Sequence, residues 1–194
     1  QTTIRDVVSF EGTGLHTGRP ATLTLHPAGA NTGIVFRRVD VIDGDNLLPA
    51  KWDQVIVSPL NTRLTNEAGL TVSTIEHLMA ALSGTGVHNV LIDIDGPEVP
   101  IMDGSAAAFV RGIVEAGVQQ VTAPLYAIEI LRDIEVRDGD AIARLAPATS
   151  LQIDFEIDFA DAAIGHQQKT LNLANGSFVR ELCDSRTFCR SSDV

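Results

Sequence analysis

The segment that decides the fold is Ser73-Thr-Ile-Glu-His-Leu-Met-Ala-Ala-Leu-Ser-Gly84, which has the period of an amphipathic helix. At about 100° per residue, its large apolar side chains fall on one stripe that should face the core, namely Ile75, Leu78, Met79 and Leu82. His77 then projects from the opposite side, and Glu76 lies on the flank. Ala80 and Ala81 share the face of His77, and such small residues leave room for another layer, as in the wall of a cleft.

Two interpretations of Glu76 and His77 follow from the residues. Ser73 and Glu76 have capping-box spacing, so Glu76 would only close the first turn, and Gly84 would end the helix. A single histidine on a helix is also typical of an ordinary surface position. Alternatively, a histidine and a glutamate on a face kept small form the wall of a cleft, where His77 is a candidate ligand.

The other four histidines form no local metal-binding pattern, because the chain has no HExxH and none of them lies three or four residues from His77. His16 lies between glycines, where a turn role and a ligand contact are both open. The remaining three, His26, His88 and His166, are interpreted as structural or exposed. Asp103 or Ser105 is predicted to cap the next helix.

The sequence on either side of this segment predicts an α+β fold. Apolar and polar residues alternate in 21–26, and further strands are expected at 34–36, 55–57, 62–65, 70–72 and 90–94. A second helix is expected over 105–117. From Leu125 the strand pattern restarts with short echoes of the first part, so we expect two similar α/β units, 1–124 and 125–194. The second has one helical stretch, near 177–183, and is expected to be incomplete.

Composition limits the partners and the compartment. Of 194 residues, 44% are hydrophobic and 20% charged, as in a globular protein, and the net charge of -11 argues against nucleic acid. Cys183 and Cys189 form no disulfide framework, which favours a reducing compartment. No transmembrane segment or secretory signal is visible in the sequence, so a cytoplasmic location is expected.

Four motifs together resemble the family of UDP-3-O-acyl-N-acetylglucosamine deacetylases, the zinc amidases of lipid A biosynthesis in Gram-negative bacteria. They are Gly12-Thr-Gly-Leu-His-Thr-Gly18, Ser73-Thr-Ile-Glu-His-Leu-Met-Ala-Ala-Leu82, Pro97-Glu-Val-Pro-Ile-Met-Asp-Gly-Ser-Ala106 and Ser185-Arg-Thr-Phe188. The resemblance runs over essentially the whole chain. It implies two α/β sandwich units, each with a sheet packed on a helix pair, and an active site between them.

The resemblance also implies roles for particular residues. Glu76 matches the family's general base and His77 matches one of three ligands of Zn²⁺. Thr187 matches a threonine that hydrogen-bonds the oxyanion, although on local pattern alone it belongs to an ordinary edge strand. Phe188 matches an aromatic residue that contacts the sugar, and Leu60 falls in the segment lining the cleft for the UDP-linked, acylated substrate. We expect the protein to be a monomer.

One departure and one absence qualify the resemblance. Cys189-Arg190 stands where many relatives continue with Gly-Phe. The family's His-Lys-x-x-Asp segment and its later histidine, which supply the other zinc ligands and the general acid, are not found in the sequence. We therefore expect the chain to be an N-terminal part that is inactive alone. The alternatives are a non-catalytic nucleotide-sugar or partner-binding module, and a different metal hydrolase whose partner subunit supplies the missing ligands.

Overall fold

The computed structural model describes residues 1–188, which contain three α-helices and fourteen strands. This confirms the predicted α+β class. Residues 1–124 and 179–188 group into one compact unit, and residues 125–178 form another. We expected residues 179–188 to belong to the second unit, whereas they group with the first. The division into domains 1–124 and 125–194 stays a prediction.

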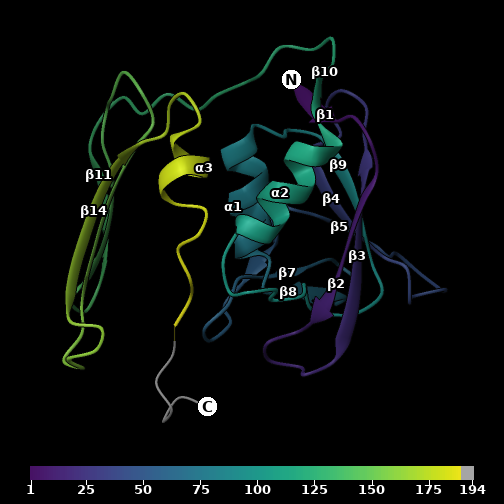
Figure 1. The fold of residues 1–194 in the computed structure, drawn as a ribbon, viewed down its shortest axis with the longest axis horizontal. Coiled ribbons are helices and arrows are strands. Elements are labelled where there is room, and N and C mark those ends of the chain that lie inside the picture. Colours follow the sequence, from purple (N-terminus) through teal and green to yellow (C-terminus); the bar gives the residue numbers. More distant parts are fainter. Residues whose placement is uncertain (189–194) are drawn as a thin grey trace. The chain divides into compact units, whose positions relative to one another are not determined.

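The first unit is built on a five-stranded sheet with the strand order β2-β3-β9-β4-β5 (Figure 1). These strands are β2 (Val8–Thr13), β3 (Pro20–Pro27), β9 (Val90–Ile94), β4 (Ile34–Arg38) and β5 (Leu47–Pro49). Only β4 and β9 pair in parallel, with Ile34 opposite Val90. In β3, Ala21, Leu23 and Leu25 are buried in alternation, as its sequence pattern predicts.

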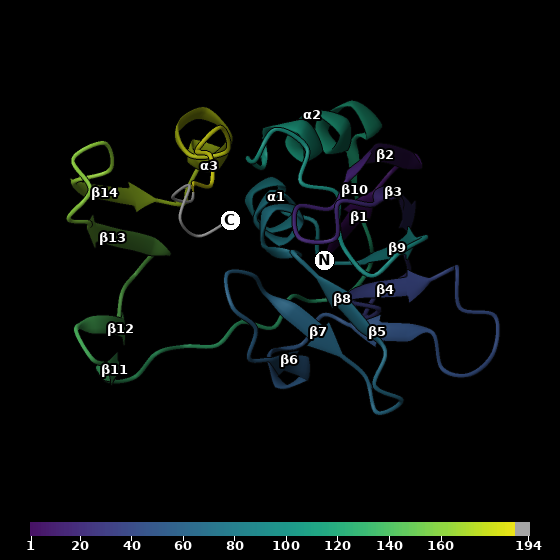
Figure 2. The ribbon, with the colours of Figure 1, turned by 90° about the horizontal axis from the view of Figure 1, so that it is seen from below.

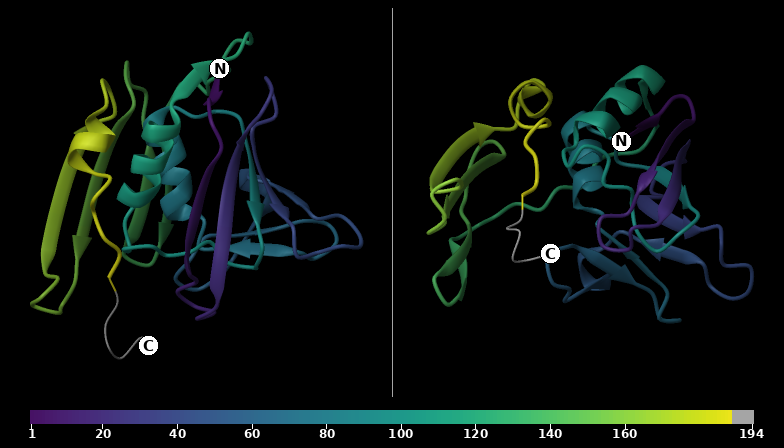
Figure 3. Two further views of the ribbon diagram at one scale, coloured as in Figure 1. Left: turned by 45° about the vertical axis from the view of Figure 1, so that its right-hand side comes forward. Right: turned by 60° about the horizontal axis from the view of Figure 1, so that its bottom comes forward.

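Two helices lie side by side on one face of this sheet, as Figures 1 and 3 show. They are α1 (Glu76–Thr85) and α2 (Ala107–Ala116). Leu78, Leu82, Phe109 and Ile113 are fully buried, and each such side chain contributes roughly 1.5–3 kcal/mol of stability. The sheet and the helix pair therefore share one apolar core.

The predicted C-terminal end of the first helix needs correction. The helix runs past Gly84 and ends at Thr85, because Gly86 adopts the left-handed conformation (φ 73°) and its N–H bonds the carbonyls of Leu82 and Ser83. That conformation favours glycine, so Gly86 is the residue that ends the helix.

Gly112 of α2 marks a close approach between this helix and β2. A Cβ at this position would lie 2.6 Å from Cζ of Phe10, whose ring packs edge-on against Phe109 with centroids 5.0 Å apart. We expect Gly112→Ala to lower the free energy of unfolding by about 1–2 kcal/mol, because the steric clash outweighs the gain in helix propensity. Urea unfolding checks this. Gly29→Ala, in open space, is the control and should change little; an unchanged midpoint for Gly112→Ala would contradict the prediction.

Two smaller sheets complete the first unit (Figure 2). One is the three-stranded antiparallel sheet of β6 (Val55–Ile56), β7 (Arg63–Thr65) and β8 (Thr71–Ser73), preceded by the 3-10 helix η1 (Trp52–Gln54). The other pairs β1 (Thr2–Ile4) with β10 (Val118–Gln120). Strand β8 leads directly into the turn before α1, so the three-stranded sheet helps to set where that helix begins.

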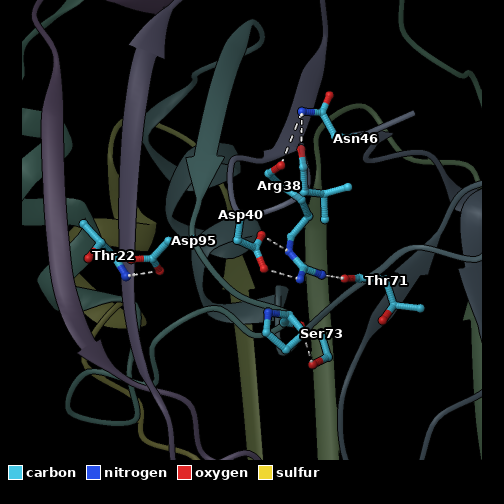
Figure 4. Close-up of polar contacts among 9 residues, drawn as sticks. Thr22, Arg38, Asp40, Asn46, Thr71, Ser73 and Asp95 are labelled. Carbon is cyan, nitrogen blue, oxygen red and sulfur yellow. Dashed lines mark hydrogen bonds and ion pairs between the residues drawn. The ribbon is translucent and has the colours of Figure 1, made fainter. Parts of the chain in front are cut away.

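A buried arginine joins the five-stranded and three-stranded sheets (Figure 4). Arg38, at the end of β4, donates hydrogen bonds from Nε and Nη2 to the two carboxylate oxygens of Asp40, both at 2.7 Å. Its Nη1 donates to the carbonyl of Thr71 in β8, at 2.8 Å. Hydrogen bonds from Arg38 lower the pKa of Asp40 below its usual range, although partial burial opposes the shift. The pair therefore prefers the ionised carboxylate.

This pair predicts a pH-dependent contribution to stability. Because the folded-state pKa of Asp40 is lowered, its contribution is complete above the unfolded value of about 4 and is lost as the pH falls through the folded value. We expect Asp40→Asn to destabilise the protein by about 1–2 kcal/mol at pH 7, after allowance for solvent at Asp40. Urea unfolding at pH 7 and at pH 3 should show the difference shrinking at low pH. Asp6→Asn removes the exposed pair with Arg5 and should have little effect; a difference for Asp40→Asn that grew at low pH would refute the assignment.

The second unit consists of two antiparallel hairpins. Strand β11 (Ile134–Asp138) pairs with β12 (Ala141–Leu145), and β13 (Gln152–Asp158) pairs with β14 (His166–Asn172). His166 is the first residue of β14, and its side chain is exposed. The chain continues into α3 (Ser177–Glu181), within the predicted 177–183. Within the part of the chain that the structure describes, no helix has the length and apolar character needed to cross a bilayer.

Candidate functional site

Glu76 is the first residue of α1 and is anchored through one carboxylate oxygen. Its Oε2 accepts a hydrogen bond from the backbone N–H of Thr62, at 3.0 Å. None of residues 1–188 donates a hydrogen bond to the other oxygen, Oε1. The side chain is half-buried at the start of the helix, where the macrodipole favours a negative charge. One oxygen is thus fixed while the other remains able to accept a proton.

The capping-box interpretation of Glu76 is wrong. Ile75 occupies the position before the helix with helical dihedral angles, and no side chain caps the first turn. The hydroxyl of Ser73 donates to the carbonyl of Pro97 at 3.1 Å, so it does not cap the helix. The carboxylate is held by a loop residue fourteen positions earlier, which local spacing cannot reveal.

His77 is half-buried beside Glu76. Neither ring nitrogen forms a hydrogen bond or ion pair with residues 1–188, so both are available to a ligand. Ala81, which was predicted to share the face of His77, is fully buried with Leu78 and Leu82. The reason is that α1 packs against α2 as well as the sheet, which buries a wider face than one apolar stripe.

The loop that anchors Glu76 also contains Leu60. Leu60 is 73% exposed and adopts a left-handed conformation (φ 61°), which is rare for a residue of its type. In the same loop, Oγ of Ser58 and Oδ1 of Asn61 are buried without a hydrogen-bond partner among residues 1–188. Such unpartnered atoms are uncommon in folded proteins, and both lie in the loop whose Thr62 anchors Glu76. Sequence reasoning missed both, because serine and asparagine are ordinary loop residues.

The 97–104 segment brings the four sequence motifs together. Pro97 and Val99 pair with Ser73 through backbone hydrogen bonds of 2.9 and 3.0 Å. Ile101 donates its N–H to the carbonyl of Thr13 at 3.0 Å, which attaches the glycine-rich loop 12–18. The first two residues of that motif, Gly12 and Thr13, are the last residues of strand β2.

The same segment attaches the last motif. The guanidinium of Arg186 donates from Nε to the carbonyl of Asp103 at 2.9 Å, and the N–H of Thr187 donates to the carbonyl of Gly104 at 2.8 Å. The side chains of Thr187 and Phe188 are exposed. No strand forms at 185–188, so the edge-strand interpretation is wrong; the two long-range hydrogen bonds hold this stretch instead. Cys189 and Arg190 lie outside the described residues.

Asp103 has a structural part in this arrangement. Its carboxylate accepts hydrogen bonds from the hydroxyl of Ser105 at 2.8 Å and from the N–H of Ser105 at 3.1 Å. These bonds lower the pKa of Asp103. The Ser105 hydroxyl in turn accepts from the N–H of Ala107, the first residue of α2. Asp103 and Ser105 therefore stabilise the turn before α2 through these hydrogen bonds. Neither is the residue just before the helix, which is Ala106.

The remaining histidines fit the structural interpretation. His26 contacts Asp93 at 3.1 Å, and that carboxylate also binds Arg37. His88 contacts the hydroxyl of Thr2 at 2.6 Å, and burial lowers its pKa. The backbone N–H of His16 donates a hydrogen bond to Oε1 of Glu98, at 2.9 Å. Among residues 1–188, no group of three or more His, Cys, Asp or Glu side chains could hold a metal ion. The described residues therefore do not complete a metal site around His77.

These observations define an α+β protein whose principal helix begins with a half-buried carboxylate and imidazole, and whose 97–104 segment is hydrogen-bonded to the other three sequence motifs. The family model for UDP-3-O-acyl N-acetylglycosamine deacetylase matches residues 1–194, and the chain belongs to this family. This confirms the resemblance drawn from the motifs.

Curated relatives agree with this assignment. The chain is 47% identical over 188 residues to the UDP-3-O-acyl-N-acetylglucosamine deacetylase of Phenylobacterium zucineum, which covers 97% of this chain and 64% of the relative. It is 44% identical to the enzyme of that name from an Anaeromyxobacter species, and the match covers 100% of this chain and 62% of the relative. It is 42% identical to the one from Vibrio cholerae, and the match covers 100% of this chain and 64% of the relative. The chain thus spans slightly less than two thirds of the length of these relatives.

Proposed function

We propose that the complete protein hydrolyses the acetamide of UDP-3-O-(3-hydroxyacyl)-N-acetylglucosamine and releases acetate, as a step of lipid A biosynthesis in a Gram-negative bacterium. Family membership and the names of the relatives support the deacetylase class. The observation that supports a hydrolytic mechanism is the position of Glu76: Thr62 anchors one of its carboxylate oxygens, and it precedes His77 in the helix. A fixed carboxylate with an available oxygen suits a general base.

In this proposal Glu76 accepts a proton from water as the water oxygen attacks the acetamide carbon. The carbonyl oxygen becomes an oxyanion, which the hydroxyl of Thr187 stabilises by donating a hydrogen bond. Collapse of the tetrahedral intermediate breaks the C–N bond, and the proton that Glu76 took from water passes to the leaving nitrogen, so that a free amine and acetate are released and the carboxylate of Glu76 is regenerated. Loss of one oxyanion donor generally costs about 2.7–4 kcal/mol, so Thr187 should matter without being essential.

Zinc is part of the proposal as a cofactor that takes His77 as one ligand. It rests on the resemblance and on the accessible imidazole, since residues 1–188 do not supply the other ligands. Phe188 and Leu60 are proposed to contact the sugar and to line the cleft, and both are exposed enough to do so. A cytoplasmic location, a monomeric state and the absence of nucleic-acid binding remain predictions from the sequence.

The decisive test is acetate release from the UDP-linked acylated N-acetylglucosamine by the complete protein. Release of one acetate per amine formed would support the proposal. Saturable binding of the nucleotide sugar without acetate release would favour the non-catalytic module instead. If zinc binding appeared only after a second subunit was added, the alternative hydrolase with shared ligands would be favoured.

A further inference from the structure

Glu98 is a buried carboxylate that the proposed reaction does not use. It is 1% exposed, and none of the described residues forms an ion pair with it. Its Oε1 accepts hydrogen bonds from the N–H of His16 at 2.9 Å and from the hydroxyl of Thr74 at 2.8 Å. Its Oε2 accepts from the N–H of Thr17 at 2.7 Å. Three donors from two distant segments therefore converge on one side chain.

These hydrogen bonds keep the carboxylate charged in the interior. Burial alone would raise the pKa of Glu98, but the hydrogen bonds from His16, Thr17 and Thr74 outweigh it, and the pKa lies below its ordinary value. A buried charge without a counter-ion is costly to retain and is stabilised here only by this set of donors. Glu98 is thus suited to hold its partners in fixed positions.

One of these partners, Thr74, has an unusual backbone. It adopts φ 58°, although β-branched residues rarely take the left-handed conformation, and it is 2% exposed. Such outliers persist only where the surroundings enforce them, and they concentrate at functional sites. The Glu98–Thr74 hydrogen bond and the backbone pairing of Ser73 with Pro97 and Val99 provide that enforcement.

The other partner is the glycine-rich loop. Gly14 lies so close to Glu98 that a Cβ at this position would be 2.4 Å from Oε2. The loop is closed by hydrogen bonds from the N–H groups of Gly14 and Gly18 to the carbonyls of Arg19 and Gly14. Glu98 therefore holds a compact loop against the turn that precedes α1.

The turn at Thr74 sets the direction in which the chain begins α1, and Glu76 is the first residue of that helix. We propose that Glu98 is a positioning residue for Glu76: by tying the loop 12–18 to Thr74, it fixes the start of α1 and hence the carboxylate and the imidazole that follow. The inference rests on the proposed function. Glu98 itself takes no part in proton transfer.

The test uses the complete protein, with Glu98→Gln and with Thr74→Val. Glutamine has one acceptor oxygen, so its amide group must face a donor that Glu98 now satisfies. Valine is close to isosteric with threonine and removes one hydrogen bond. For both variants we expect kcat to fall by about 10- to 100-fold with little change in KM, because a misplaced base slows the chemical step more than binding. Thr74→Ser keeps the hydroxyl and should restore kcat.

Glu115→Gln, an exposed glutamate on α2, is the matched charge control and should behave as wild type. Wild-type kcat in folded Glu98→Gln and Thr74→Val would overturn the inference, and so would failure of Thr74→Ser to restore kcat. Failure of both Glu98→Gln and Thr74→Val to fold would also overturn it, since Glu98 would then serve folding as a whole. If the wild-type complete protein releases no acetate, it is the proposed function that fails.

Discussion

Replacing Glu76 by glutamine in the complete protein is expected to lower kcat for acetate release by about 10²- to 10⁴-fold, the usual contribution of a general base. The variant is informative because it separates the anchoring hydrogen bond of this side chain, which the structure shows, from its proposed role as general base. The amide oxygen of glutamine can still accept the hydrogen bond from Thr62, so the anchor to the loop is kept. Only the ability to take a proton from water is lost.

Two controls make this result specific. Glu115→Gln makes the same chemical change on an exposed position of α2 and should leave kcat within about twofold of wild type, as for most surface substitutions. The Tm of Glu76→Gln should fall by only a few degrees, because loss of the charge at the start of α1 costs about 0.3–1 kcal/mol and no core contact is altered. A Glu76→Gln protein that kept its kcat would remove the general-base role, even if the protein were a deacetylase.

Much of the fold follows from periodicity. The alternation in 21–26 and the apolar stripes of both long helices correspond to β3, α1 and α2. The start of α1 was mispredicted for a physical reason. Local spacing favours a capping box at Ser73, but long-range pairing of Ser73 with Pro97 and Val99, and the left-handed turn at Thr74, take precedence over it.

The site was predictable only in part. Glu76 and His77 could be proposed from the sequence because they lie off the apolar stripe of a clearly periodic helix. Thr187, Phe188 and Leu60 have no local signal and were reached through the family resemblance. Glu98 could not be identified, because its donors lie 24, 81 and 82 positions away and only the folded chain brings them together.

His77→Ala in the complete protein is expected to abolish stoichiometric zinc binding, measured as metal content after dialysis. Catalytic zinc sites in proteins generally use three protein ligands and a water molecule, so losing one of three should leave the site unable to retain the ion. This readout does not depend on turnover. His166→Ala, which removes an exposed imidazole from β14, is the matched control and should retain zinc.

The chain of residues 1–194, tested by itself, provides a second experiment on zinc binding. Residues 1–188 place one suitable imidazole beside Glu76 and contain no group of three potential ligands, so we expect this chain alone to lose zinc on dialysis and to release no acetate. If it retained about one zinc ion per molecule, His77 would have partners that the described residues do not reveal. If His77→Ala in the complete protein retained zinc, the metal would bind elsewhere, and the proposed role of His77 as a zinc ligand would be wrong.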